Sequence, residues 1–400
     1  MFGVTLSIGP YRFAAPVVLA PMAGVTNQAF RRLCLDLMTA AAGDPASGTS
    51  GPGAFVSEMV TSRALVERTP ESMRLIAHDP DVHPRSVQLY GVDPGTVAAA
   101  VTMLVEEDRA DHIDLNFGCP VPKVTRKGGG SALPWKHELF RAILAQAVRV
   151  AAPAGVPVTV KMRKGIDDDH LTYLEAGRIA EGEGVAAVAL HARTASQYYS
   201  GVADRRAIAA LKEAVTTIPV LGNGDIWVAE DALSMMAETG CDGVVVGRGC
   251  LGRPWLFADL AAGFAGSPQR VRPSLGEVIT VLRRHLVLLE AHYRDNGAED
   301  PQTHACRDIR KHIAWYLKGY SVRQEHRAGL AMVESIAGFD ALAAQLDLDQ
   351  PYPGEVAEAP RGRAGSPRTV ALPHGWLDSP DLDPVSAERL GEAELSVSGG

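Results

Sequence analysis

The sequence predicts an α/β protein: a TIM (β/α)8 barrel, followed by a small α-helical domain and a mostly disordered C-terminal tail. Three observations predict it. Eight short apolar, β-branched runs alternate with stretches of helical periodicity, each run ends in polar or small residues, and the strand pattern stops after Phe264. Eight βα units in about 250 residues suit a TIM barrel, whereas a doubly wound sheet, the second choice, usually has fewer strands.

The eight candidate strands are short runs between helical patterns. They are Val17–Ala20, Phe55–Glu58, Ser86–Tyr90, His112–Asn116, Val158–Lys161, Ala187–His191, Pro219–Gly222 and Gly243–Val246. Apolar residues at i, i+3 and i+4 predict helices between them, most clearly over Glu138–Val150, Tyr173–Glu181 and Ala229–Glu238. The segment Thr39–Gly53 is rich in Ala, Gly, Ser and Pro, and we interpret it as a flexible surface insertion.

Three domains follow from these patterns: a barrel over 1–265, a helical domain over 270–348 and a tail over 349–400. Helical periodicity in the second covers Ser274–Asn296, His304–Lys318 and Gln324–Leu346. The tail is rich in Pro, Gly, Ala and acidic residues and has little periodicity, which is typical of disorder.

The net charge of −8 is unevenly distributed along the chain. Residues 331–400 hold 4 Lys and Arg against 12 Asp and Glu, whereas residues 270–330 hold 11 Lys and Arg against 7 Asp and Glu. The acidity therefore belongs to the terminal segment, and a local basic surplus leaves a nucleic-acid partner open.

The composition also indicates the cellular compartment of the protein. The five cysteines are widely spread and form no CxxC pair, which argues against zinc, other metal sites and a disulfide framework. No apolar run approaches the ~18 residues of a membrane span, and the N-terminus lacks a basic segment typical of signal peptides. We expect a cytoplasmic protein with no membrane partner.

The stretch from Asp114 to Leu133 is the most informative motif. A strand delivers Asn116 to the barrel rim, and a loop shaped by Gly and Pro then carries Cys119. A lone cysteine is most often a small core residue. Here its place in a loop favours function, and its thiol, with an ordinary pKa of about 8.5, can act as a general acid. A basic rim beside the flexible run Gly128–Gly130 suits an anionic substrate; its members are Lys123, Arg126 and Lys127.

Glycine-rich turns end the seventh and eighth candidate strands, at Gly222–Asp225 and Gly247–Gly249. In TIM barrels the loops at these places bind phosphate, and Arg248 adds charge and bidentate geometry. A flavin nucleotide or a sugar phosphate would both serve.

Polar residues end three other strands. Lys161 can stabilise negative charge on a reduced flavin, and Gln88 can hydrogen-bond the polar edge of the ring. A rim salt bridge is the plain alternative for Lys161 or His191, but their matched places on successive strands favour function. No GxGxxG follows a strand, so no Rossmann dinucleotide site is expected.

Several motifs together resemble the tRNA-dihydrouridine synthases, closest to the bacterial B-type group. They are LAPMAGVT (19–26), LNFGCP (115–120), KVTRKGGGSAL (123–133), HART (191–194), GNGD (222–225) and GRPW (252–255). The resemblance covers roughly residues 17–346. It implies an FMN-binding barrel with a helical tRNA-binding domain.

The resemblance also implies residue roles. Those that bind the cofactor are Pro21, Met22, Ala23, Gln88, Lys161, His191, Asn223, Gly224, Asp225, Gly247 and Arg248. Those that contact the substrate tRNA are Asn116, Lys123, Arg126, Lys127, Arg193, Arg310 and Lys311. Trp315, on the same predicted helix as Lys311, is expected in the core of that helix.

The implied reaction saturates the C5=C6 bond of a specific uridine in tRNA. NADPH (or NADH) reduces FMN, hydride passes from flavin N5 to C6, and Cys119 protonates C5. The uridine must leave the stack to reach the pocket. The partner is tRNA, and we expect a monomer without a metal.

Two alternatives compete with this interpretation. One is an FMN barrel that reduces a small molecule, as dihydroorotate-dehydrogenase-like enzymes do, but such a substrate needs no basic helical domain. The other is an RNA-binding barrel without catalysis, which needs neither Cys119 nor the flavin residues. A purified protein that is yellow from bound flavin would indicate an enzyme and argue against the second alternative.

Overall fold

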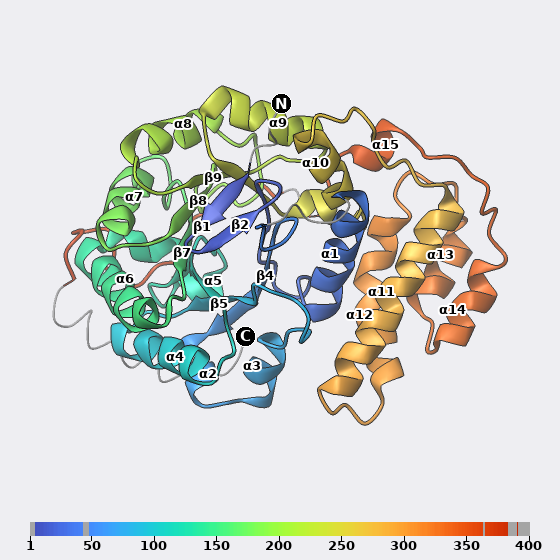
Figure 1. The fold of residues 1–400 in the computed structure, drawn as a ribbon, viewed down its shortest axis with the longest axis horizontal. Helices are drawn as coiled ribbons and strands as arrows, with labels where there is room; N and C mark the ends of the chain where they lie inside the picture. Colours follow the sequence, from blue (N-terminus) through green and yellow to red (C-terminus); the bar gives the residue numbers. More distant parts are fainter. Residues whose placement is uncertain (1–4, 43–47, 363–364, 383–389, 391–400) are drawn as a thin grey trace.

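A closed barrel of eight parallel strands lies at the centre of the structure, a computed structural model that describes residues 5–42, 48–362, 365–382 and 390 (Figure 1). The strands follow one another in chain order, and the last pairs with the first, Val244 opposite Val17. They are β3 (Val17–Leu19), β4 (Ala54–Thr61), β5 (Ser86–Tyr90), β6 (His112–Phe117), β7 (Val158–Arg163), β8 (Ala187–His191), β9 (Val220–Asn223) and β10 (Gly243–Val246). The predicted TIM barrel is confirmed.

Helices cover the outside of the barrel (Figure 1). The predicted helix Glu138–Val150 is the observed α6 (His137–Ala151), and its apolar stripe, which includes Phe140 and Leu144, is buried against the strands. The other helices of this layer are α1 (Gln28–Ala42), α2 (Ser62–Val66), α3 (Pro70–Leu75), α4 (Pro94–Glu106), α7 (Tyr173–Gly182), α8 (Arg205–Ala214), α9 (Ala229–Thr239) and α10 (Leu256–Phe264). The short helix α5 (Pro122–Thr125) belongs to the loop that follows β6.

An antiparallel hairpin, β1 (Leu6–Ile8) and β2 (Tyr11–Phe13), closes the N-terminal end of the barrel. Leu6, Ile8 and Phe13 form one buried apolar cluster with inward-facing strand residues. Each strand has only three residues, too few to show an alternating pattern, so the sequence did not predict the hairpin. Because this end is plugged, a ligand enters from the opposite, C-terminal end.

The chain after the barrel is helical, as predicted. It forms α11 (Leu275–Asp295), α12 (Pro301–Tyr316), α13 (Gln324–Ala331) and α14 (Ile336–Ala343), packed side by side at one flank of the barrel (Figure 1). The single helical stretch predicted over Gln324–Leu346 is wrong, because Ser335 caps a new helix: its side chain accepts from the Gly338 N–H.

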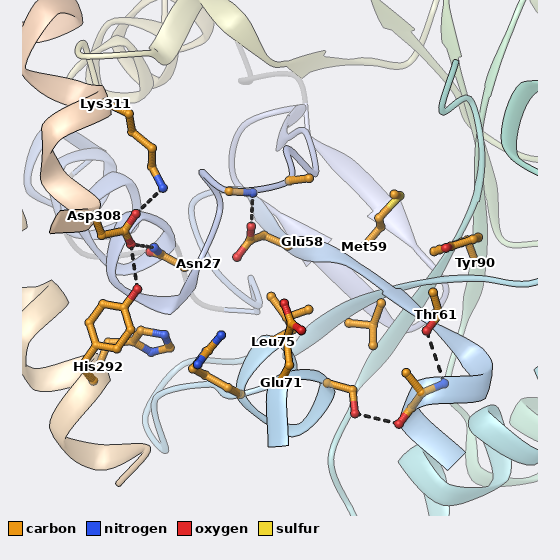
Figure 2. Close-up of a pocket in the computed structure, with 17 residues that line it drawn as sticks. Asn27, Glu58, Met59, Thr61, Glu71, Leu75, Tyr90, His292, Asp308 and Lys311 are labelled. Carbon is orange, nitrogen blue, oxygen red and sulfur yellow. Dashed lines mark hydrogen bonds and ion pairs between the residues drawn. The ribbon is translucent and has the colours of Figure 1, made fainter. Parts of the chain in front are cut away.

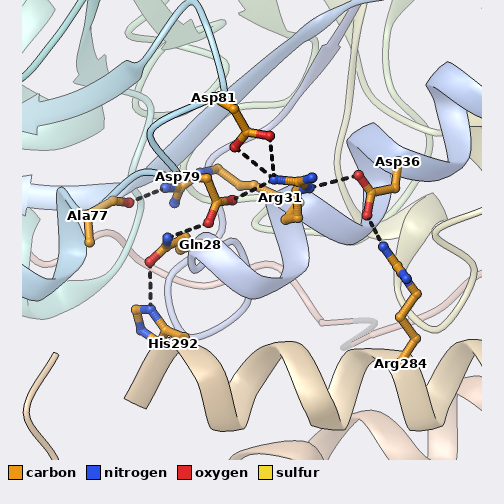
Figure 3. A network of polar contacts seen from close by, with 9 residues as sticks. Gln28, Arg31, Asp36, Ala77, Asp79, Asp81, Arg284 and His292 are labelled. Atoms are coloured by element: carbon orange, nitrogen blue, oxygen red, sulfur yellow. Dashed lines mark hydrogen bonds and ion pairs between the residues drawn. The ribbon is translucent and has the colours of Figure 1, made fainter. Parts of the chain in front are cut away.

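Polar contacts fasten this helical region to the barrel (Figure 3). On α1, Gln28 contacts both sides: its Nε2 donates to Asp79 at 2.7 Å and its Oε1 lies 3.0 Å from Nδ1 of His292 on α11. Asp36 of α1 forms an ion pair with Arg284 of α11. The helical region therefore has a defined position beside the barrel.

The tail differs from its prediction. Disorder is wrong for the described residues 349–362 and 365–382, because Trp376 is only 3% exposed and its Nε1 donates to the Ala132 carbonyl at 3.0 Å. The Lys136 ammonium donates to the carbonyls of Ser379 and Asp381. A Pro- and Gly-rich segment needs no periodicity to be ordered when a large side chain buries itself on a neighbouring surface.

The first part of the tail crosses toward the open end of the barrel. Arg361 is buried and donates to the Trp315 carbonyl of α12. Further along, the Arg368 N–H donates to the Ser196 carbonyl at 2.9 Å, in the loop after β8. Residues 355–358 form the short helix α15 (Glu355–Glu358).

The predicted insertion Thr39–Gly53 also differs in its described residues. Helix α1 continues to Ala42, and the Ser50 N–H donates to the Arg12 carbonyl of the hairpin. Residues 43–47 lie outside the described part. Alanine is the best helix former, which explains why an Ala-rich run extends α1.

Candidate active site

The C-terminal end of the barrel holds a cavity of about 450 Å³. Every residue predicted to bind the cofactor lines it, as do Asn116 and Cys119. The members come from the ends of β3, β5, β6, β7, β8, β9 and β10 and the loops that follow them. Parallel strands point their carboxyl ends to the same side, so residues far apart in sequence converge here.

Cys119 lies in the cavity wall, on a loop held by hydrogen bonds. The Oδ1 atom of Asn116 accepts from the N–H groups of Gly118 and Cys119, at 3.1 and 2.9 Å. On the other side, the Cys119 carbonyl accepts from the backbone N–H and hydroxyl of Ser131, both at 3.1 Å. Burial raises the pKa of the Cys119 thiol, so it stays protonated at neutral pH.

The run Gly128–Gly130 is buried beneath this loop, not a flexible rim as the sequence suggested. Gly130 has φ +56°, and a Cβ there would come within 2.4 Å of the Cys119 carbonyl oxygen. Glycine is therefore required for the close approach that fixes Cys119.

A hydrogen-bonded chain runs from Asn116 into the barrel. Asn116 Nδ2 donates to Gln88 Oε1 at 2.9 Å, and Gln88 Nε2 donates to Asp114 at 2.6 Å. Asp114 also accepts from the Thr159 hydroxyl at 2.6 Å, and Thr159 contacts His112 at 2.8 Å. Because each partner is fixed by the next, the Gln88 amide faces the cavity in a set orientation.

Three cationic or titratable side chains gather at the ends of β7 and β8. The side chains of Lys161 and His191 have no hydrogen bond or ion pair with any described residue. Burial, and next the charge of Arg163, lowers the pKa of Lys161 to about 8. The same two causes hold the pKa of His191 well below its usual range, so its imidazole is neutral at pH 7.

The two glycine turns lie against each other at the far side of the cavity. A Cβ on Gly249 would come within 2.1 Å of the Ile226 carbonyl oxygen, so the backbones nearly touch. Beside them, Arg248 stacks on the rings of Tyr199 and Trp227, with its guanidinium carbon 4.3 and 5.2 Å from the ring centroids. Arg248 is therefore an oriented positive charge beside the glycine turns, and its guanidinium also lies 3.8 Å from the Asp225 carboxylate.

Arg193 does not line the cavity. It is buried, and its guanidinium lies 2.8 Å from both carboxylate oxygens of Asp225, with further bonds to the Ser200 and Gly201 carbonyls. It positions Asp225, which does line the cavity. The predicted direct contact of Arg193 with substrate therefore has no support in this arrangement.

The other predicted tRNA contacts lie outside the cavity. Lys123 and Arg126 are exposed on the loop after Cys119, and Lys127 is half-buried. On α12, Arg310 is half-buried, and Lys311 forms an ion pair with Asp308 and lines a second cavity, described below.

Sequence reasoning missed several lining residues. Arg163 is buried, and its Nε donates to the Gly118 carbonyl at 2.9 Å, which anchors the Cys119 loop. It stands two residues after Lys161 on β7, so strand alternation could have found it. Trp315, expected in the core of its helix, is half-buried and lines the mouth. Tyr199 and Trp227 lie in loops that give no such signal.

Among the residues that the structure describes, no helix is long and apolar enough to cross a membrane. In the same part of the chain, no group of three or more His, Cys, Asp or Glu side chains is placed to hold a metal ion.

Comparison with known proteins assigns the family. The dihydrouridine synthase family model matches residues 18–348. The chain is 57% identical over 389 residues to a "Probable tRNA-dihydrouridine synthase" of Mycobacterium tuberculosis, which covers 96% of each chain. It is 55% identical over 390 residues to the Mycobacterium leprae protein of that name (93% of this chain, 99% of the other). It is 38% identical over 347 residues to "tRNA-dihydrouridine synthase B" of Xanthomonas campestris (87% and 95%).

These matches confirm the resemblance predicted from the motifs, including its B-type relatives. The chain belongs to the dihydrouridine synthase family, whose members are flavin-dependent oxidoreductases that act on tRNA.

Proposed function

We propose that this protein is a tRNA-dihydrouridine synthase that reduces the C5=C6 bond of a uridine in tRNA, with FMN as its flavin and NADPH, or NADH, as the reductant. The observation that carries the proposal is the Cys119 thiol, held in the wall of the same 450 Å³ cavity as the Lys161 ammonium, which has no hydrogen bond or ion pair with the residues that the structure describes. A proton donor and a cation beside one cavity suit reduction of a polar double bond.

The donors of the cavity support FMN. The phosphate would lie at the glycine turns beside Arg248, where the guanidinium offers a positive charge and bidentate geometry. Pro21, Met22 and Ala23 offer apolar surface, and Gln88 offers an oriented amide for the polar edge of the ring. Asn223, Gly224, Asp225 and Gly247 complete the wall around the chain to the phosphate.

When bound, the reduced flavin supplies the hydride that saturates one carbon of the uridine. The other carbon needs a proton, and Cys119 donates it, because the raised pKa keeps the thiol protonated. Lys161 contributes positive charge toward negative charge on the flavin. The neutral His191 adds no charge that would compete with it.

The helical region would hold the tRNA. We propose catalysis by residues 1–265 and tRNA binding by residues 270–348, with help from the basic residues Lys123, Arg126 and Lys127. The basic surplus of residues 270–330 supports this division. The same proposal places the protein in the cytoplasm as a monomer, which light scattering after gel filtration tests.

The test is to purify the protein and incubate it with NADPH and tRNA that lacks dihydrouridine. We expect a yellow protein and a tRNA whose mass rises by two hydrogens at one uridine, mapped by mass spectrometry of nuclease fragments. A colourless protein that does not bind FMN would refute the proposal.

A further inference from the structure

A second cavity of about 300 Å³ lies between the barrel and the helical region (Figure 2). Its walls come from the ends of β3 and β4, from α2 and α3, and from α11 and α12. Ala23 and Met59 line both this cavity and the larger one, so the two are neighbours. Its volume is at the lower end of the roughly 300–1,000 Å³ of small-ligand pockets.

Glu58 places a buried acceptor in this cavity. The residue is 6% exposed, and one carboxylate oxygen accepts from the Gly24 N–H (Figure 2). Its other oxygen has no hydrogen-bond partner among the described residues. Burial raises the pKa of Glu58, and a buried carboxylate with a free oxygen gains most from a ligand N–H donor.

A donor faces the same space from α12. Lys311 lies over the Gly24 turn: its ammonium is 3.9 Å from the position that a Cβ on Gly24 would take. Asp308 holds it by an ion pair and is itself fixed by Asn27 at 3.2 Å and by the Tyr293 hydroxyl at 3.3 Å (Figure 2). The barrel therefore supplies an acceptor and the helical region a donor, side by side.

The charges of the lining disfavour a phosphate. The cavity is lined by three acidic residues, Glu58, Glu71 and Asp308, and by two basic residues, Arg74 and Lys311. Burial lowers the pKa of His292, a further lining residue, to about 4, so it adds no positive charge at neutral pH. An uncharged ligand with N–H donors beside a carbonyl oxygen fits this set better than an anion.

We propose that this cavity receives a guanine base of the tRNA from a nucleotide flanking the target uridine. Guanine presents adjacent N–H donors and one carbonyl oxygen on a single edge, which complement the Glu58 carboxylate and the Lys311 ammonium. Extruding a uridine into the larger cavity unstacks its neighbours, and unstacked RNA bases are read on such edges. The inference rests on the proposed function and adds a determinant of which uridine is reduced.

The test compares tRNAs that differ at one base. After the target uridine is mapped, guanosines within two nucleotides of it are replaced in turn by adenosine, which loses both N1–H and O6. We expect one replacement to lower kcat/KM for uridine reduction by the wild type about tenfold or more, the scale for hydrogen bonds to a charged group.

The variant Glu58→Gln removes the charge and keeps the shape. It should lower kcat/KM on native tRNA by a similar factor and no longer distinguish guanosine from adenosine, since both changes break the same contact. The matched control is Glu67→Gln, an exposed carboxylate at the end of α2 that does not line the cavity, and it should behave as the wild type. The rate of flavin reduction by NADPH should be unchanged in both variants.

Three outcomes overturn the inference: no guanosine within two nucleotides of the mapped uridine, a wild type equally active on every replaced tRNA, or a Glu58→Gln variant whose KM for NADPH rises. The last would assign the cavity to the reductant. A wild type that forms no dihydrouridine on native tRNA would instead refute the proposed function, so the two failures are distinguishable.

Discussion

The Oδ1 atom of Asn116 accepts a hydrogen bond from the backbone N–H of Cys119, at 2.9 Å. The proposed proton donor is therefore positioned by the last polar residue of its own strand. Asn116 is itself fixed by Gln88 at 2.9 Å, so a barrel-interior network determines where the thiol lies.

We expect Asn116→Ala to slow uridine reduction by about 10- to 100-fold, because two backbone N–H groups lose their acceptor and the loop shifts. Single-turnover formation of dihydrouridine measures this rate. The control is Ser131→Ala on the other side of the loop, where the backbone N–H still bonds the Cys119 carbonyl at 3.1 Å. Equal losses in both variants would contradict a specific role for Asn116.

Cys119→Ala should separate the two half-reactions. Flavin reduction by NADPH should persist within about twofold, and uridine reduction should fall by about 100-fold or more, since only the second needs the proton. Stopped-flow flavin absorbance follows both steps. Loss of both would show that Cys119 has another role.

The pH profile of uridine reduction should reflect the protonated thiol. Burial raises the Cys119 pKa above the ordinary value of about 8.5. The acid form therefore persists through neutral pH, and the rate should stay flat there and fall on the alkaline side, where Lys161, with a pKa of about 8, loses its charge before the thiol does. A rate that rises as pH passes from 7 to 9 would indicate that the thiolate acts instead.

Acid should weaken the helical region. His285 and His312 are 0% exposed, with ring centroids 4.7 Å apart, and burial lowers the pKa of His285 to about 3 and that of His312 well below its usual range. In the unfolded chain a histidine has a pKa of about 6.5. Protons therefore bind the unfolded state first, and stability is full above pH 6.5 and falls as pH drops toward 3.

Between pH 6.5 and 3, each such histidine lowers the free energy of unfolding by about 1.4 kcal/mol for every unit by which the pH falls. His312→Phe, which would pack beside Phe30, should make the fall of Tm with acid shallower. The exposed His304→Phe is the control and should leave the slope unchanged. Calorimetric Tm values between pH 7 and 5 decide between the two results.

We expect the tail to stabilise the segment that packs against the Cys119 loop. Trp376→Ala removes a buried ring that contacts Gly128 and donates to the Ala132 carbonyl. We expect the free energy of local unfolding to fall by about 3 kcal/mol. Hydrogen exchange in residues 365–382 and 128–136 should rise. Trp376→Phe keeps a smaller buried ring and loses the hydrogen bond, so it should cost less than the alanine variant. Unchanged exchange in 128–136 would show that the tail does not support the loop.

The sequence by itself determined the barrel, the order of its strands and the residues at their ends. The polar ends at Gln88, Asn116, Lys161 and His191 were visible because a strand buried on both faces is apolar until it reaches the rim. Specific motifs such as the one around Cys119 then indicated the family. These are local signals, carried by neighbouring residues.

Only the tertiary structure decided which of these groups meet. Arg193 turned out to hold Asp225, Arg163 to hold the Cys119 loop, and the tail to be anchored by Trp376. The second cavity joins Glu58 of β4 to Lys311 of α12, residues 253 positions apart in a chain of 400. Such pairings depend on how helices dock on the barrel, and no periodicity along the chain records the distance between elements that pack together only after folding.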